Sequence, residues 1–277
     1  MKALLGLVMA VVVIAGCAAQ PDDEDFAGLV AIGNGRGLFL DCHGSGSPTA
    51  FIIPGKGSYA AEWNAVMRSV AKTTRVCAYD RPNTRPDGSD RSTPVPQPHT
   101  VQQDVEDLVK LIAAVELSTP IVVVAHSYGG LIADLLARTH PTLVSGLVFV
   151  DPTSEYLPRL GRADQDAEFD QAARTATPDG EAFFASDAFV ALKAAPPLAL
   201  PRVPAVVLSS DMFPPRRKAA AQDYTKYQIH RANSVLAETL WADNLIVPAS
   251  GYSVMRCQPQ LVAAKIIAIV AKVRASS

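Results

Sequence analysis

"VVVAHSYGGLIADLLA", residues 122–137, starts as a β-branched run, breaks at His-Ser-Tyr-Gly-Gly and resumes with the spacing of a helix. A continuous β-branched run is typical of a strand buried on both faces of a parallel sheet. Ser127 therefore stands at the junction of a buried strand and a helix, among small residues. Such a junction is a sharp turn that exposes the hydroxyl, and the following helix directs its N–H groups to the same place.

Seven further segments have strand patterns, and helical patterns separate most of them. The pair Asn34-Gly35 between two apolar runs predicts an antiparallel hairpin. From residue 100 onward strands and helices alternate, which is typical of a mostly parallel sheet covered on both faces. We predict an α/β fold with an eight-stranded, mostly parallel sheet and an antiparallel N-terminal edge. The expected strands are 28–32, 37–42, 49–55, 74–80, 121–125, 144–151, 203–210 and 244–249.

Residues 152–202 interrupt this alternation with a polar, then alanine-rich, then proline-rich stretch. We predict a helical insertion after the strand that ends at Asp151. Ligands of open α/β sheets bind beyond the carboxyl ends of the strands. An insertion at that place is expected to cover a site as a cap.

The first residues have the pattern of an export signal. A lysine is followed by a short apolar core that ends at Ile14-Ala15-Gly16-Cys17. This ending resembles the lipobox of bacterial lipoproteins, in which the cysteine becomes the lipid-modified N-terminus. We expect a signal peptide over residues 1–16, a lipid on Cys17 that anchors the protein to the cell membrane, an acidic tether over residues 17–27 and one domain over residues 28–277.

The remaining cysteines are Cys42, Cys77 and Cys257, and an exported protein permits disulfides. Cys42 and Cys77 both lie in expected strands, so they are the better pair. Cys257 is expected to be a small buried apolar residue.

The composition is that of a globular protein, with 49% hydrophobic residues and a net charge of −2. This charge gives no reason to expect a nucleic-acid partner. No cluster of His, Cys and Asp has the spacing of metal ligands, so neither a metal nor a cofactor is expected. Both tryptophans, Trp63 and Trp241, have helical spacing and are expected in the core.

Residues 37–273 resemble the α/β-hydrolase fold family, most closely in the stretch that follows Ala125. The resemblance implies that Ser127 is the catalytic nucleophile, with Ala125 in place of the first glycine of Gly-x-Ser-x-Gly. It also implies an oxyanion hole built from the backbone N–H groups of Lys56 and Tyr128, because Pro54-Gly55-Lys56-Gly57 resembles the family's oxyanion loop. In the family's usual strand order the strands of Cys42 and Cys77 are neighbours, which supports that disulfide.

The resemblance leaves two candidates for the catalytic acid and none for the usual base. Asp211 follows the strand after the cap and is the preferred acid, and Asp151 is the alternative. Tyr252 stands where the family has its histidine. A phenol with a pKa near 10 is a poor base at neutral pH.

The five histidines are each expected to be structural. They are His43, His99, His126, His140 and His230. His99 is the best substitute for the missing base, because the long proline-rich loop before it can fold over the strand ends.

Two functions follow from this pattern. One is an exported, weakly active or atypical serine hydrolase that acts on a small-molecule or lipid ester. The other is a degenerate hydrolase with a binding or scaffolding role at the membrane. The intact serine turn favours the first, and Tyr252 favours the second.

Overall fold

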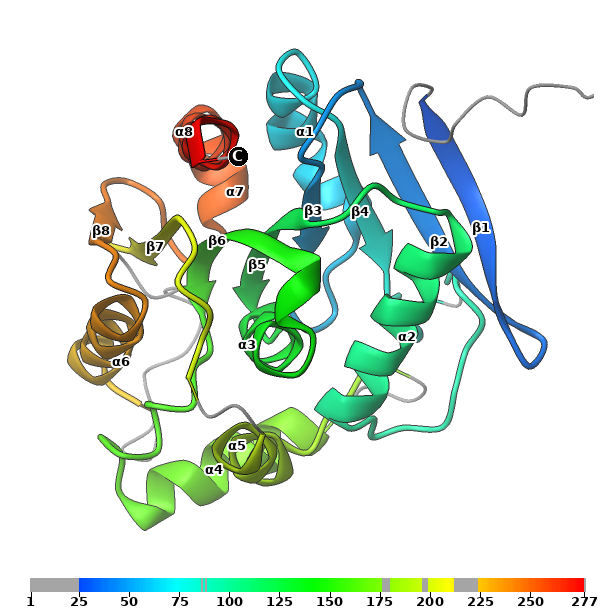
Figure 1. The fold of residues 1–277 in the computed structure, drawn as a ribbon. Helices are drawn as coiled ribbons and strands as arrows, with labels where there is room; N and C mark the ends of the chain where they lie inside the picture. The colour runs from blue at the N-terminus through cyan, green and yellow to red at the C-terminus, as the bar shows by residue number, and fades with distance from the viewer. Residues whose placement is uncertain are drawn as a thin grey trace, which may run out of the picture.

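The computed structural model describes residues 25–85, 87, 89–175, 180–195, 199–211 and 224–276. Its centre is one eight-stranded sheet in the order β1-β2-β4-β3-β5-β6-β7-β8 (Figure 1). The pairs β1–β2 and β2–β4 are antiparallel, and all others are parallel. The predicted fold class is thereby confirmed. The strands are β1 (Phe26–Gly33), β2 (Arg36–His43), β3 (Ala50–Ile53), β4 (Val76–Asp80), β5 (Ile121–Ser127), β6 (Val144–Pro152), β7 (Ala205–Ser210) and β8 (Asn244–Val247).

Helices cover both faces of the sheet, with α1, α7 and α8 on one face and α2, α3 and α6 on the other (Figure 1). The strand β3 shows why its apolar run is continuous. Ala50 and Ile52 pack into the cluster under α1 and α8, whereas Phe51 and Ile53 pack into the cluster under α2 and α3. The helices are α1 (Asn64–Val70), α2 (Val101–Ala114), α3 (Gly129–Thr139), α4 (Ala163–Arg174), α5 (Ala185–Ala194), α6 (Lys226–Thr239), α7 (Val254–Cys257) and α8 (Pro259–Ser276), with short 3-10 turns at Ala60–Trp63 and Pro141–Leu143.

The N-terminal boundary of the domain differs from the boundary that the sequence predicts. β1 begins at Phe26, two residues inside the expected tether, because Phe26 pairs with Cys42 of β2. The expected signal peptide and Cys17 lie outside the described residues. α6 begins at Lys226, after a capping box at Thr225. Residues 212–223 also lie outside the described residues.

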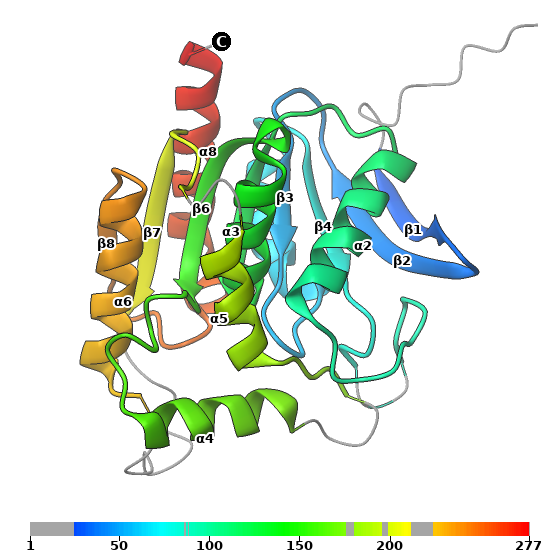
Figure 2. The same ribbon diagram turned by 60° about the horizontal axis from the view of Figure 1, so that its bottom comes forward.

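The predicted insertion contains the helices α4 and α5. Figure 2 shows α4 lying across the carboxyl ends of the parallel strands, with α5 beside α3. The segment therefore has the position of a cap. None of the helices in the described ranges combines the length and the apolar character needed to cross a bilayer.

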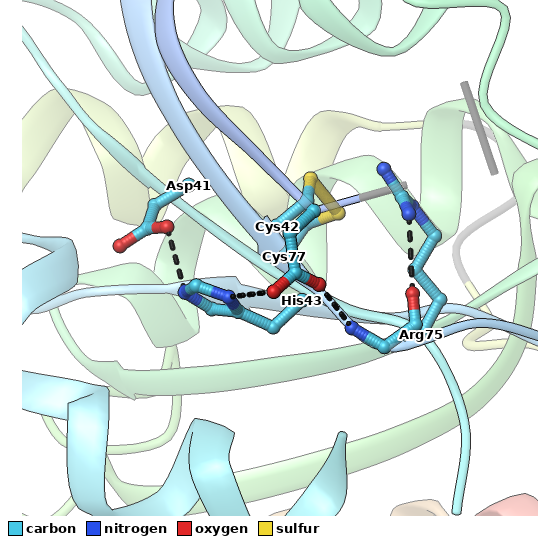
Figure 3. Close-up of a disulfide and its surroundings, with 7 residues drawn as sticks. Asp41, Cys42, His43, Arg75 and Cys77 are labelled. Atoms are coloured by element: carbon cyan, nitrogen blue, oxygen red, sulfur yellow. Dashed lines mark hydrogen bonds and ion pairs between the residues drawn. A yellow bond between two sulfur atoms is a disulfide. The ribbon is translucent and has the colours of Figure 1, made fainter. Parts of the chain in front are cut away.

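Cys42 of β2 and Cys77 of β4 are directly opposite each other and form a disulfide (Figure 3). Beside it, the two ring nitrogens of His43 contact carboxylates, 3.2 Å from Asp25 and 2.9 Å from Asp41. Cys257 is exposed, contrary to the expectation that it is buried.

Replacing Cys42 and Cys77 together by alanine is expected to lower the free energy of unfolding by about 2–4 kcal/mol, because the bridge closes a long loop in the unfolded chain. The sequence separation of the two cysteines is 35. Urea denaturation of the parent and the double variant measures the loss. A change well below 1 kcal/mol, with the bridge verified in the parent, contradicts this expectation.

Candidate active site

Ser127 lies in a strained turn between β5 and α3. Its φ is +49°, in the left-handed region, and the register against β6 shifts between His126 and Ser127. Two glycines permit this turn. A Cβ on Gly129 would lie 2.3 Å from the carbonyl oxygen of Ile53, and one on Gly130 would lie 2.7 Å from the Cβ of Pro152. The sequence motif is therefore explained by close packing of the turn against β3 and β6.

The turn at residues 54–57 comes directly against Ser127. A Cβ on Gly55 would meet Ser127 Cβ at 3.1 Å and His126 Nδ1 at 2.8 Å. No hydrogen bond from the backbone N–H of Lys56 or Tyr128 occurs among the turn and loop contacts of the described residues. Among these contacts of the described residues, neither predicted oxyanion donor thus has a backbone acceptor. Tyr128 directly follows Ser127, and Lys56 follows Gly55, which packs against Ser127.

Tyr252 contacts the serine hydroxyl. Its phenol donates a hydrogen bond of 2.6 Å to Ser127 Oγ, although 39% of the residue is exposed. Burial of the phenol end raises the pKa of Tyr252, against the opposing effect of the bond to Ser127, and the charge of Asp151 raises it further. At neutral pH Tyr252 is therefore a neutral donor to Ser127, which is the reverse of what a general base does.

The two candidate acids have different partners. Asp211 accepts hydrogen bonds from the backbone N–H groups of Ala249, Ser250 and Gly251, which precede Tyr252. Burial acts to raise the pKa of Asp211, but these bonds outweigh it and lower the pKa. The carboxylate holds the loop of Tyr252 through its backbone.

Asp151 ends β6 in a left-handed conformation, with φ of +43°. Its buried carboxylate accepts bonds from the N–H and the hydroxyl of Ser210, at 3.0 and 2.8 Å. Burial raises the pKa of Asp151 despite these bonds. Its charge also acts on Tyr252, so Asp151 is electrostatically coupled to the residue that contacts the serine.

His126 lies beneath this site. Its Nε2 is 3.3 Å from the carbonyl oxygen of Tyr252, and its buried Nδ1 has no hydrogen-bond partner among the described residues. Burial lowers the pKa of His126 to about 4. The ring is therefore neutral at physiological pH and a weak base.

The other histidines make contacts elsewhere. His99 Nδ1 is 2.8 Å from one carboxylate oxygen of Asp104, and the other oxygen accepts the Tyr128 hydroxyl. His99 is therefore linked through Asp104 to Tyr128, and among the described contacts it has none with Ser127. His230 Nε2 is 2.6 Å from the carbonyl oxygen of Ser210. His43 bonds the two aspartates described above, and His140 bonds Thr139.

The sequence reading missed a buried ion pair beside the turn at residues 54–57. Arg81 Nε lies 2.6 Å from Glu181, and both side chains are almost fully buried. Arg81 directly follows a buried strand in the sequence, which is a usable signal. Glu181 lies 100 residues away in the cap, and no local pattern marks it. Within the described ranges no group of three or more His, Cys, Asp or Glu side chains is arranged to hold a metal ion.

Known proteins similar to this chain include one named as a hydrolase and one named as a transporter. "Putative carbamate hydrolase RutD" of Caulobacter segnis is 32% identical over 129 residues, which are 46% of this chain and 47% of that protein. "Probable transporter efuK" of Hormonema carpetanum is 34% identical over 140 residues, 48% of this chain and 20% of that protein. The matches thus span less than half the length of these relatives.

A thermophilic esterase from Thermogutta terrifontis has a similar structure, with a TM-score of 0.60 over 90% of this chain and 99% of that chain, at 18% identity. This likeness shows a shared fold. The model of the Alpha/beta hydrolase family matches residues 38–265. The chain therefore belongs to the alpha/beta hydrolase family.

Proposed function

We propose that this protein is an exported, lipid-anchored serine hydrolase that attacks an ester or related acyl substrate with Ser127 and turns over slowly. The observation that supports the proposal is the strained turn of Ser127, which packs against the turn at residues 54–57. In the proposal, the backbone N–H groups of Lys56 and Tyr128 bind the acyl oxygen. Two preorganised N–H donors stabilise the charge that develops on an acyl oxygen. The esterase that shares this fold, and the carbamate hydrolase relative, support an acyl substrate.

In the proposed reaction Ser127 Oγ forms a bond to the acyl carbon and the carbonyl electron pair moves onto the oxygen between the two N–H groups. The collapse of this intermediate expels the alcohol and leaves an acyl-serine, which water then hydrolyses. The serine proton passes to solvent water in the first step, and the leaving alkoxide takes a proton from water. Tyr252 occupies the position of the family's histidine but does not accept this proton, because its neutral phenol already donates to Ser127.

Slow turnover follows from this missing base. An oxyanion hole and substrate binding alone retain roughly 10³–10⁴-fold catalysis over water when a triad is disabled. In the proposal, Asp211 holds the loop that carries Tyr252. Asp151 is the carboxylate whose charge raises the pKa of the Tyr252 phenol.

The second candidate is a degenerate hydrolase that binds a ligand at the membrane without converting it. The bond from Tyr252 to Ser127 favours it, because a serine that accepts a hydrogen bond is a weaker nucleophile. The lipid anchor on Cys17 is common to both candidates and rests on the resemblance of residues 14–17 to a lipobox.

Labelling of fractionated bacteria with a fluorophosphonate probe tests the proposal. We expect slow labelling in the membrane fraction for the parent and none for Ser127→Ala. Cys17→Ser is expected to keep the labelling and to lose the membrane association. If the parent is not labelled, the hydrolase proposal fails and the binding role remains. If the Cys17→Ser variant stays in the membrane fraction, the proposed lipid anchor on Cys17 is wrong.

A further inference from the structure

A short part of the cap, residues 181–184, contacts Gly57, which follows Lys56, and Tyr128. Lys56 and Tyr128 are the residues that the proposed function uses to hold the oxyanion. We call it the cap bridge. Its backbone is fixed on two sides: Ala182 accepts a bond of 2.9 Å from the N–H of His99, and Phe183 donates one of 3.1 Å to Ala173 in α4. The side chain of Glu181 bonds Gly57 and Arg81, and the ring of Phe183 stacks on Tyr128.

Glu181 and Arg81 hold the turn at residues 54–57. The guanidinium of Arg81 donates to the carbonyl oxygens of Pro54 and Gly55, at 2.8 and 2.6 Å. The carboxylate of Glu181 accepts the N–H of Gly57 at 2.6 Å and pairs with Arg81. Both side chains are buried, at 2% and 4% exposure, so water does not replace these bonds.

These bonds set the direction of the Lys56 N–H. The carbonyl of Gly55 and the N–H of Lys56 belong to one peptide group, which is planar and trans, so the two point in opposite directions. When Arg81 fixes the Gly55 oxygen, the N–H of Lys56 is fixed as well. The Lys56 side chain adds a further tie, because its ammonium donates to the carbonyl oxygens of Ala172, Ala173 and Thr175 at the end of α4.

Phe183 holds the second donor residue. Its ring stacks on Tyr128 with the centroids 3.8 Å apart and the planes at 18°. The Tyr128 hydroxyl donates to Asp104, and Asp104 also contacts His99, the residue whose backbone pairs with the cap bridge. The Tyr128 ring is therefore held at its face and at its hydroxyl.

We propose that the cap bridge positions both backbone donors of the oxyanion hole, with Glu181 acting through the turn at residues 54–57 and Phe183 acting through Tyr128. The proposal rests on the proposed function. According to this proposal the cap covers the site and also fixes the positions of the oxyanion donors. Glu181 and Phe183 are positioning residues that need not touch the substrate.

The variant Glu181→Gln tests the first arm, because an amide keeps the shape but loses the charge that pairs with Arg81. Glu155→Gln is the matched control, since Glu155 is an equally buried carboxylate whose ion pair is with Arg138 of α3. We expect Glu181→Gln to lower the maximal rate of fluorophosphonate labelling by about 10- to 100-fold with little change in the half-saturating probe concentration. Glu155→Gln is expected to leave both values near the parent.

Hydrogen exchange provides a readout that needs no activity. In Glu181→Gln the amide of Gly57 is expected to exchange at least about tenfold faster than in Glu155→Gln, because its bond to the carboxylate is weakened. If the parent is labelled but Glu181→Gln matches Glu155→Gln in rate and in exchange, the cap bridge has no positioning role. If the parent is not labelled, the proposed function fails. The exchange rate of the Gly57 amide then decides by itself whether Glu181 holds the turn at residues 54–57.

Phe183→Leu tests the proposed action of Phe183 on Tyr128. It also provides a test of the cap bridge if Glu181→Gln does not fold. Loss of the stacked ring is expected to slow labelling by a similar factor and to speed exchange at Tyr128. A variant with the parent's labelling rate and exchange overturns that action.

Discussion

Tyr252→His is expected to raise the rate of Ser127 acylation by about 10²–10⁴-fold, the usual contribution of a positioned general base. The Tyr252 hydroxyl already reaches Ser127 Oγ at 2.6 Å, and the loop that carries it is held by three backbone bonds to Asp211. An imidazole at position 252 would therefore lie close to the Ser127 hydroxyl. Stopped-flow hydrolysis of a short-chain p-nitrophenyl ester measures the acylation rate.

Tyr252→Phe is the control, because it removes the hydroxyl without adding a base. A gain of the same size in Tyr252→Phe would show that release of the serine, not base catalysis, explains the increase. Adding Asp151→Asn or Asp211→Asn to Tyr252→His identifies the acid, since loss of the orienting carboxylate removes the gain.

The pH dependence separates the parent from the histidine variant. In the parent, burial lowers the pKa of His126 to about 4 and raises the pKa of Tyr252 above its usual value. Neither group changes its charge near pH 7. The parent's labelling rate is therefore expected to show no inflection from these two groups between about pH 6 and 9, whereas the rate of Tyr252→His falls as its imidazole is protonated below about pH 6.5.

Arg138→Met is expected to lower the free energy of unfolding by about 3–5 kcal/mol, because it leaves buried carboxylates without their cation. Arg138 contacts Asp134 at 2.6 Å and Glu155 at 2.7 Å, and all three side chains are buried. These bonds tie the helix that follows Ser127 to the segment after β6. Urea denaturation measures the loss, and Arg231→Met, which breaks an exposed pair with Glu238, is the control.

The loss in Arg138→Met is expected to grow with pH. Burial raises the pKa of Asp134 to about 6 even with Arg138 beside it, and removing the arginine raises it further. A carboxyl whose folded pKa exceeds its unfolded pKa binds more protons in the folded state between the two values. The free energy of unfolding therefore falls as pH rises through that window. A variant equally destabilised at pH 4.5 and pH 8 contradicts this account of the buried cluster.

Much of the fold is readable because its signals are local. The β-branched runs locate the strands, the pair Asn34-Gly35 locates the hairpin, and the small residues around Ser127 locate the turn. Each pattern depends on neighbours a few residues away. Both tryptophans also have helical spacing, yet only Trp63 is buried. Trp241 is 77% exposed with Arg202 over its ring, since it follows the end of α6 and has left the face that packs on the sheet.

The site is harder to read because its contacts are long-range. Ser127 and Tyr252 stand out as motif residues, but that the phenol donates to the serine depends on how the loop after β8 folds. Asp211 follows a strand as expected, yet its oxygens are taken by backbone N–H groups of that loop. Glu181 and Arg81 carry no motif, and their pairing appears only when the cap folds over the turn at residues 54–57.

The most direct test of the account is the location of the covalent adduct. Purified protein is incubated with a fluorophosphonate to completion, digested and sequenced by mass spectrometry, beside Ser127→Ala. We expect one phosphonyl group per chain, on Ser127, and no adduct in the variant. An adduct on Tyr252 or on any other residue, or none on the parent after prolonged incubation, contradicts the claim that Ser127 is the nucleophile.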